Sequence, residues 1–90
     1  MTFKIGQKVA IPCVVKPGAF SSESFVAMET VHGTVSGFVE NELVQNRGGR
    51  HFLEGIVEEI SDRTLTVRIH GSFFTTSGVA DFDEDYLKAA

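Results

Sequence analysis

The strongest constraint on this fold comes from residues 65–70, where apolar and polar side chains alternate one by one. Successive side chains of a β-strand point to opposite faces, so Leu65, Val67 and Ile69 are predicted to face a core. The polar side chains between them are then predicted to face outward. A period of two excludes a helix here and predicts a sheet with one buried face.

The residues on either side of this strand predict the closing part of a small β-protein. Residues 56–60 read as the preceding strand, and residues 61–64 form the turn between the two. After a loop over residues 72–78, residues 79–82 predict a short strand, and Asp83 is placed to cap a final helical turn. Glu58 and Glu59 are adjacent and cannot share a face, so a β-bulge near Gly55 is also expected.

The first half of the chain adds shorter strands separated by turn signals. Residues 5–11 predict an opening strand, and Pro12 is expected to end its ladder because proline has no N–H to donate. Residues 16–19 (Lys-Pro-Gly-Ala) form a turn, and residues 46–50 form another around two adjacent glycines. Residues 25–31 and 34–39 are either one bent strand or a tight pair, with Gly33 at the kink or turn.

Together these elements predict an all-β fold of five or six short antiparallel strands with a short C-terminal helical turn, the pattern of a sandwich or a small barrel. Ninety residues correspond to a single domain over residues 1–90. The single cysteine, Cys13, rules out an intrachain disulfide and fits a reducing cytoplasm. No apolar run reaches the ~20 residues of a membrane span, so a cytoplasmic, soluble protein is expected.

The charge argues against a general nucleic-acid binder, because phosphate recognition needs clustered lysine and arginine. The formal net charge is −4. Residues 51–90 carry three basic and eight acidic side chains, whereas residues 1–50 carry five and four. An acidic C-terminal face is a candidate docking surface for a basic partner; the alternative is a solvated turn whose carboxylates lie near a helix N-terminus.

The closing half of the chain resembles a known group of small barrels. The segments Gly55-Ile56-Val57, residues 65–69 and Phe82-Asp83-Glu84-Asp85-Tyr86-Leu87 are similar to SH3-like barrels of the electron-transport accessory group. That group includes a peripheral photosystem I subunit and the variable chain of ferredoxin–thioredoxin reductase. The resemblance covers residues 54–87 well and residues 5–11 weakly. It implies a small SH3-like barrel of five or six antiparallel strands and a docking role on a larger redox assembly.

No catalytic or metal-binding pattern emerges, and no cofactor is expected. The histidines at positions 32, 51 and 70 lack the close spacing of readable metal ligands. The turn formed by Arg47, Gly48, Gly49 and Arg50 is a candidate anion site, since backbone N–H groups and guanidiniums bind anions; the alternative is an ordinary soluble hairpin tip.

Aromatic composition points instead to a protein surface. Eight phenylalanines are many for so small a core, and two of them are adjacent in one loop. The predicted partner-binding residues are Phe73, Phe74, Asp81, Asp83 and Asp85. The alternative is that both rings close the mouth of the barrel.

The resulting functional hypothesis is a non-enzymatic protein-binding or assembly module that self-associates as a homodimer or small homo-oligomer. One alternative is an accessory subunit docked on a redox complex. Another is an enzyme whose site forms only at a homo-oligomer interface.

Overall fold

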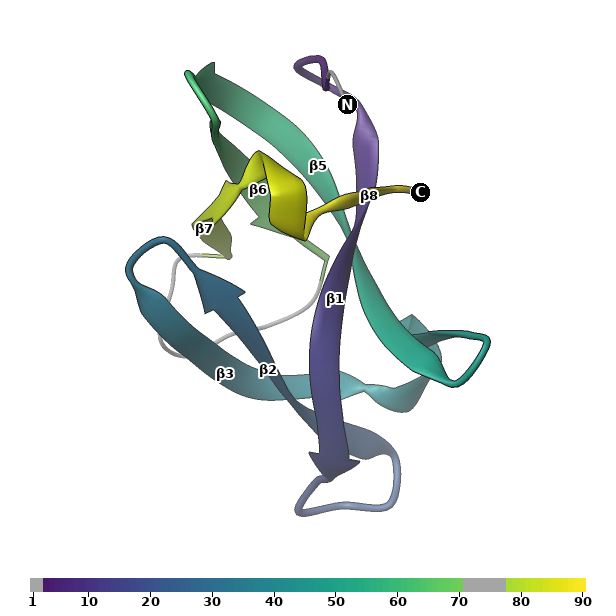
Figure 1. Cartoon of the computed structure of the whole chain (residues 1–90). Coiled ribbons are helices and arrows are strands. Elements are labelled where there is room, and N and C mark those ends of the chain that lie inside the picture. The colour runs from purple at the N-terminus through teal and green to yellow at the C-terminus, as the bar shows by residue number, and fades with distance from the viewer. Residues whose placement is uncertain (1–2, 71–77) are drawn as a thin grey trace.

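The computed structural model describes residues 3–70 and 78–90, which form one antiparallel sheet curled into a half-barrel (Figure 1). The predicted all-β class is therefore confirmed. The longer strands are β1 (Lys8–Pro17), β2 (Glu23–Thr30), β3 (Gly33–Glu40), β5 (Arg50–Ser61), β6 (Thr64–Ile69) and β7 (Val79–Asp83). Two short strands, β4 (Gln45–Arg47) and β8 (Lys88–Ala89), were not expected from the sequence. Two 3-10 turns, η1 (Asn41–Leu43) and η2 (Glu84–Tyr86), complete the described elements.

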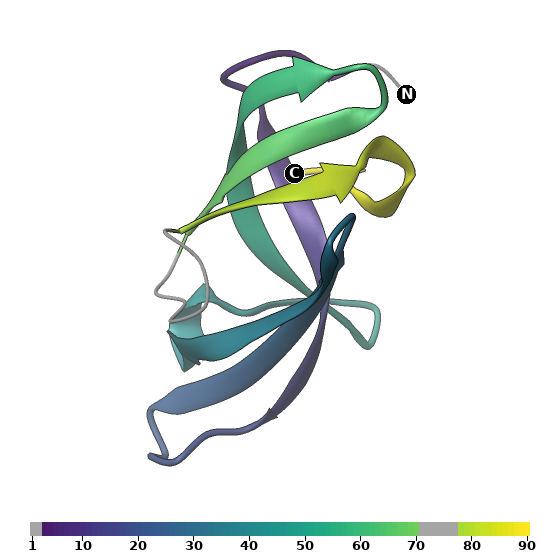
Figure 2. The same ribbon diagram turned by 90° about the vertical axis from the view of Figure 1, so that its left-hand side faces the viewer.

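The strand order is β3-β2-β1-β5-β6-β7, with β4 added beside β5 and β8 added beside β1. Strand β1 belongs to both halves of the sheet. Its residues 8–13 pair with β5, and its residues 14–17 pair with β2. Figure 2 shows the two halves as separate layers that are joined along β1. The long bent strand thus gives the half-barrel its curvature.

The expectation that Pro12 ends the first strand is wrong. Strand β1 continues through Pro12, which lies opposite Phe52 of β5. On its other side, β1 pairs with β8 at residues 9–10 and with β2 from residue 14 onward. Pro12 therefore lies in the gap between β8 and β2, where the ladder does not need an N–H donor.

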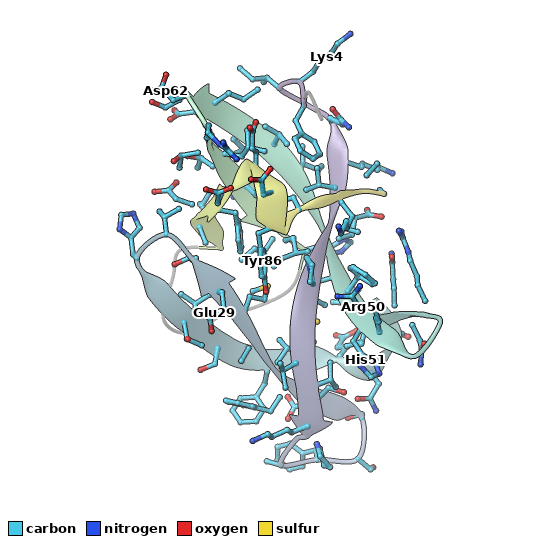
Figure 3. All side chains as sticks on the ribbon, viewed as in Figure 1. Lys4, Glu29, Arg50, His51, Asp62 and Tyr86 are labelled. Carbon is cyan, nitrogen blue, oxygen red and sulfur yellow. The ribbon has the colours of Figure 1, made fainter. Side chains whose placement is uncertain are left out.

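A tyrosine hydroxyl fills that gap. Continuing the β1–β2 register by two residues beyond Val14 would place Pro12 opposite Glu29. Instead, the Glu29 N–H donates to the Tyr86 hydroxyl over 3.2 Å, and that hydroxyl donates to the Pro12 carbonyl over 2.5 Å. Tyr86 lies between the two halves of the sheet (Figure 3). Its side chain replaces the missing rung and satisfies two backbone groups.

The turns predicted around Gly33, at residues 46–50 and at residues 61–64 are tight hairpins. At the predicted turn over residues 16–19, Lys16 and Pro17 still belong to β1, and residues 18–22 form a longer loop before β2. Residues 25–31 and 34–39 form a pair of strands, and Gly33 has a φ of 117° beside the turn. Gly48 and Gly49 have φ values of 58° and 85° between β4 and β5, as a two-residue hairpin turn with both residues left-handed requires. Asp62, with a φ of 54°, makes the turn between β5 and β6.

The β-bulge lies three residues farther along β5 than Gly55, near which the sequence indicated it. The register with β6 shifts between Val57 and Glu59, so Glu58 is the extra residue. Gly55 has a different role. A Cβ atom there would lie 2.5 Å from Val67 Cγ1 and 3.0 Å from the Arg68 carbonyl oxygen, so only glycine allows β5 and β6 to pack this closely.

The core lies between the two halves, and the predicted core residues are confirmed: Leu65, Val67 and Ile69 are buried. The inner faces of β1, β2, β5 and β7 supply most of the remaining core side chains. The C-terminal turn also follows the prediction, because the Asp83 side chain accepts a hydrogen bond from the Asp85 N–H over 2.9 Å. The described residues contain no helix that is both long and apolar enough to cross a membrane.

The buried position of Ile69 predicts a large loss of stability on truncation. Ile69→Ala should lower the free energy of unfolding by about 2–5 kcal/mol, because a well-packed core leaves a cavity. Chemical denaturation monitored by circular dichroism measures this. Ile5→Ala is the matched control, since Ile5 is 68% exposed and should cost little. Equal, small effects of both changes would contradict the assigned core.

The bridging hydroxyl predicts a specific cost for Tyr86→Phe. The ring still stacks on Phe82, at a centroid distance of 5.8 Å, but the Glu29 N–H and Pro12 carbonyl lose their partner. Loss of the two hydrogen bonds should cost about 1 kcal/mol in unfolding free energy. Amide hydrogen exchange should also accelerate at Glu29. A variant with unchanged stability and unchanged exchange would show that the bridge is unimportant.

Candidate binding site

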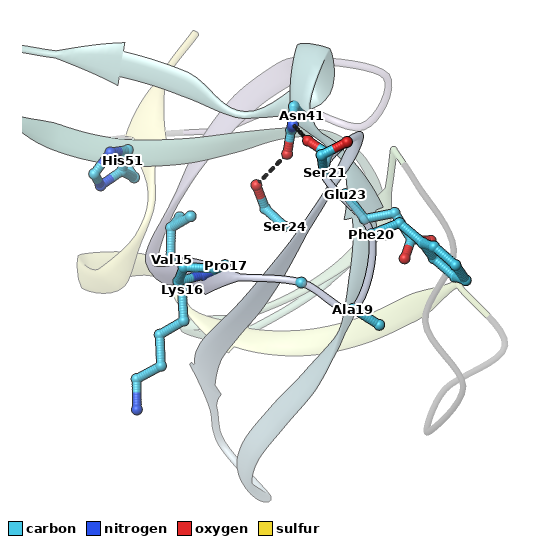
Figure 4. A pocket seen from close by; sticks show the side chains of 11 residues that line it. Val15, Lys16, Pro17, Ala19, Phe20, Ser21, Glu23, Ser24, Asn41 and His51 are labelled. Atoms are coloured by element: carbon cyan, nitrogen blue, oxygen red, sulfur yellow. Dashed lines mark hydrogen bonds between the residues drawn. The ribbon is translucent and has the colours of Figure 1, made fainter.

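An open hollow of about 500 Å3 lies beside the end of β1, where β1 and β5 separate. We call it the β1 hollow (Figure 4). Its lining comes from the end of β1, the β1–β2 loop, the start of β2, η1 and β5: Val15, Lys16, Pro17, Gly18, Ala19, Phe20, Ser21, Glu23, Ser24, Asn41 and His51. Every lining residue belongs to the described part of the chain. The lining combines apolar side chains with one lysine, one glutamate and several uncharged polar side chains.

The β1–β2 loop is held in place by backbone contacts. The Gly18 N–H donates to the Glu23 carbonyl over 3.2 Å, and the Glu23 N–H donates to the Phe20 carbonyl over 3.1 Å. A Cβ atom on Gly18 would lie 2.8 Å from the Glu23 carbonyl oxygen, so a larger residue would force the two segments apart. This compact loop presents Phe20 with 70% of its surface exposed.

Asn41 clamps the loop to the far side of the hollow. Its N–H donates to the Ser22 carbonyl over 3.0 Å, and its side-chain amide donates to the Ser21 carbonyl over 2.7 Å. Its Oδ1 accepts from the Ser24 hydroxyl over 2.6 Å. The sequence analysis did not single out Asn41, because a polar residue after a strand is usually only a turn former.

Phe20 is the exposed aromatic residue that the sequence analysis missed. Of the described phenylalanines, those at positions 3, 52 and 82 are buried. Phe25 and Phe38 lie opposite each other in β2 and β3 and pack edge to face at a centroid distance of 5.3 Å. The sequence did carry a signal for Phe20, which comes directly after the Pro-Gly-Ala turn. A large aromatic side chain in a loop often belongs to a binding surface. Phe73 and Phe74 lie outside the described residues.

The acidic side chains of the predicted partner surface form contacts within the chain. Arg63 contacts Asp83 over 4.0 Å and Glu84 over 3.4 Å, and it also pairs with Asp85. These groups are exposed enough that such ion pairs contribute little stability. The cluster remains net acidic on the surface, because one guanidinium faces three carboxylates.

Asp81 has a separate role at the seam between the two halves of the sheet. Its carboxylate accepts from the Thr66 hydroxyl over 2.7 Å and contacts His32 Nε2 over 3.1 Å. The bond from Thr66, followed by the bond from His32, holds the pKa of Asp81 below its ordinary value. The Asp81 carbonyl also accepts from the Val31 N–H over 3.0 Å, which joins the tip of the β2–β3 hairpin to β7.

The predicted anion turn uses several of its donors internally. The Arg47 guanidinium lies 5.3 Å from the centroid of the Phe52 ring and donates to the Ala89 carbonyl over 3.3 Å. The Gly49 N–H donates to Asn46 Oδ1 over 3.1 Å. Arg50 is exposed on the same hairpin and is the guanidinium left facing solvent. Anion binding at this turn remains a prediction, carried mainly by Arg50.

Two arrangements bear on catalysis. In the seam, the threonine hydroxyl donates to the aspartate rather than to the histidine, so this trio lacks the order of a nucleophilic triad. Burial raises the pKa of the Cys13 thiol to about 11, which keeps it protonated at neutral pH. No group of three His, Cys, Asp or Glu side chains within residues 3–70 and 78–90 is placed to hold a metal ion.

The raised pKa predicts slow alkylation of Cys13. The thiolate is the reactive form, so at pH 8 iodoacetamide should modify Cys13 much more slowly in the folded protein than in urea. Intact mass spectrometry over time measures this. The pKa of the thiol is higher in the folded state, at about 11, than its ordinary value of 9.0. The contribution of this group to the free energy of unfolding should therefore fall as pH rises from about 9 to about 11. Equal rates in both states would contradict the buried environment.

Neither family models, nor curated proteins, nor solved structures give a match to this chain.

Proposed function

We propose that this protein is a non-enzymatic protein-binding or assembly module that joins a partner, or a second copy of itself, through the β1 hollow and its rim. One observation carries the proposal: a fixed loop holds Phe20 exposed beside an open hollow. Because glycine packing and the Asn41 clamp already order this loop, binding would not have to order it. Aromatic side chains in such positions are frequent anchors of protein interfaces.

The chemistry of the described residues supports binding over catalysis. The Cys13 thiol is protonated at neutral pH, and the Thr66 hydroxyl is bonded to a carboxylate instead of a general base. Activating either group would require a base brought from elsewhere. In an enzyme site shared between subunits, the second subunit would have to supply that base across the interface.

The proposal extends to the finer identity of the fold. An SH3-like barrel of the electron-transport accessory group would be a docking subunit, in agreement with the resemblance of residues 54–87. Such a subunit should be monomeric on its own and should bind only its complex. The average molecular mass of a self-associating module should instead rise with protein concentration, so molecular mass in solution distinguishes the two possibilities.

The test compares two exposed apolar side chains at opposite ends of the molecule. Phe20→Ser removes the proposed anchor, and Ile5→Ser is the matched control with a similar exposed fraction of 68%. Burying a phenylalanine contributes about 1.5–3 kcal/mol, so Phe20→Ser should weaken association by roughly 10-fold to 100-fold. Sedimentation velocity over a concentration series measures self-association, and affinity capture from native extract measures partner binding.

The two variants give opposite expectations. Ile5→Ser should associate like the unmodified chain, and both variants should keep the same thermal melt. If Phe20→Ser also associates normally, the β1 hollow is not the binding surface. If neither self-association nor partner capture occurs with the unmodified chain, the assembly function itself is wrong.

A further inference from the structure

Strand β1 ends with backbone groups that the described strands leave without a ladder partner. Its pairing with β5 stops at Cys13 and His51, whereas its pairing with β2 continues to Pro17 and Ser24. Residues 15–17 are therefore paired on one side and form a sheet edge on the other. This edge runs along the β1 hollow (Figure 4).

Two hydrogen bonds determine which groups point to the open side. The Gly18 N–H donates to the Glu23 carbonyl in the β1–β2 register, so even-numbered residues of β1 direct their backbone groups toward β2. The Val57 N–H donates to the Gln7 carbonyl over 3.0 Å in the β1–β5 register, so odd-numbered residues face β5. The two bonds agree, because the backbone groups of successive residues in an antiparallel strand point alternately to one neighbouring strand and the other.

Val15 and Pro17 thus direct their backbone groups to the side that β5 has left. One more rung would place Gly49 opposite Val15, but Gly49 is in the hairpin turn and its N–H donates to Asn46. Three backbone groups at the edge have no partner among residues 3–70 and 78–90: the N–H and carbonyl of Val15, and the carbonyl of Pro17. Pro17 has no N–H, so the edge is short and cannot template a long sheet.

We propose that this edge binds an extended segment of a partner protein, which adds a strand beside β1 and places its inward side chains in the β1 hollow. Backbone pairing of this kind supplies affinity, and alternate side chains supply specificity. The inference rests on the proposed protein-binding function and specifies its mode and ligand class.

The side chains of β1 define the pattern of the segment. Residues directly opposite each other in a ladder share a face, so those opposite Val15 and Pro17 face the hollow and should be apolar. The residue between them lies opposite Lys16, whose side chain points in the opposite direction from that of Val15 (Figure 4). That pair is of the non-hydrogen-bonded type, which brings side chains closest, so a carboxylate complements Lys16. The segment therefore reads apolar, acidic, apolar.

A second copy of this chain fits the edge less well. Antiparallel pairing of two copies about Lys16 would place the two lysines directly opposite each other, and like charges there are destabilising. Pro17 would also offer no donor to its partner. A segment from another protein, with an N–H at each position and a carboxylate opposite Lys16, makes the bonds that self-pairing loses.

The test uses the full chain and two pentapeptides. The first probe is acetyl-Thr-Val-Glu-Val-Thr-amide, and the second carries lysine in place of glutamate. In nitrogen-15 NMR titrations, the glutamate peptide should shift the amides of residues 14–20 and His51 and slow hydrogen exchange at Val15. The lysine peptide should bind at least about fivefold more weakly, as an opposite-charge pair is replaced by a like-charge pair.

Three variants locate the binding mode. Val15→Pro removes an N–H that points away from β2, so the native ladder remains while peptide affinity should fall about tenfold. Lys16→Glu should reverse the preference between the two peptides. Lys8→Glu changes the same charge on the same strand, far from the hollow, and should leave both affinities unchanged. If Val15→Pro fails to fold, the charge reversal at Lys16 decides.

The outcomes separate this inference from the function on which it rests. Absence of peptide binding, or binding that Val15→Pro and Lys16→Glu leave unchanged, overturns strand addition at this edge. If Phe20→Ser still abolishes association in that case, the binding function stands and uses side-chain contacts alone. If Phe20→Ser has no effect while the peptide results hold, the strand edge is the site and Phe20 is not its anchor.

Discussion

The architecture depends on one bridge, in which the Tyr86 hydroxyl accepts from the Glu29 N–H and donates to the Pro12 carbonyl. It lies where β1 passes from one half of the sheet to the other. A strand that serves two half-sheets must have a point at which one neighbour has ended and the next has not begun. Backbone groups at that point lose their ladder partners, and each hydrogen bond that replaces one contributes to stability. Tyr86 supplies these hydrogen bonds from the C-terminal turn, which therefore has to dock between the halves.

The same division of β1 produces the candidate site. Because β5 turns back at Gly48 and Gly49 while β1 continues to Pro17, the two strands separate and leave the β1 hollow between them. The β1–β2 loop and η1 then close its remaining sides through Asn41. Curvature, core and hollow are thus consequences of one long strand whose two ends have different neighbours. The acidic turn and the seam at Asp81 lie elsewhere and carry other roles.

The sequence predicted local elements well where side-chain alternation or turn chemistry was strong. The strand at residues 65–70, the turn around Gly48 and Gly49 and the cap by Asp83 are local features, and each is present. Errors arose where the neighbours of a strand mattered. Pro12 reads as a strand end unless its missing N–H faces a gap, and the bulge position depends on the register with β6. The short strands β4 and β8 carry too few residues to show a pattern.

The sequence alone determined that this chain forms a sheet with one apolar face, because a period-two pattern and glycine-rich turns are properties of neighbouring residues. It also indicated a surplus of aromatic side chains, without indicating which one is exposed. Only the tertiary structure decided that Phe20 stands on the rim of a hollow, that Asn41 clamps its loop and that Val15 faces an open edge. These features join residues that are distant in sequence. Their positions follow from strand register and curvature, which the packing of the whole sheet sets.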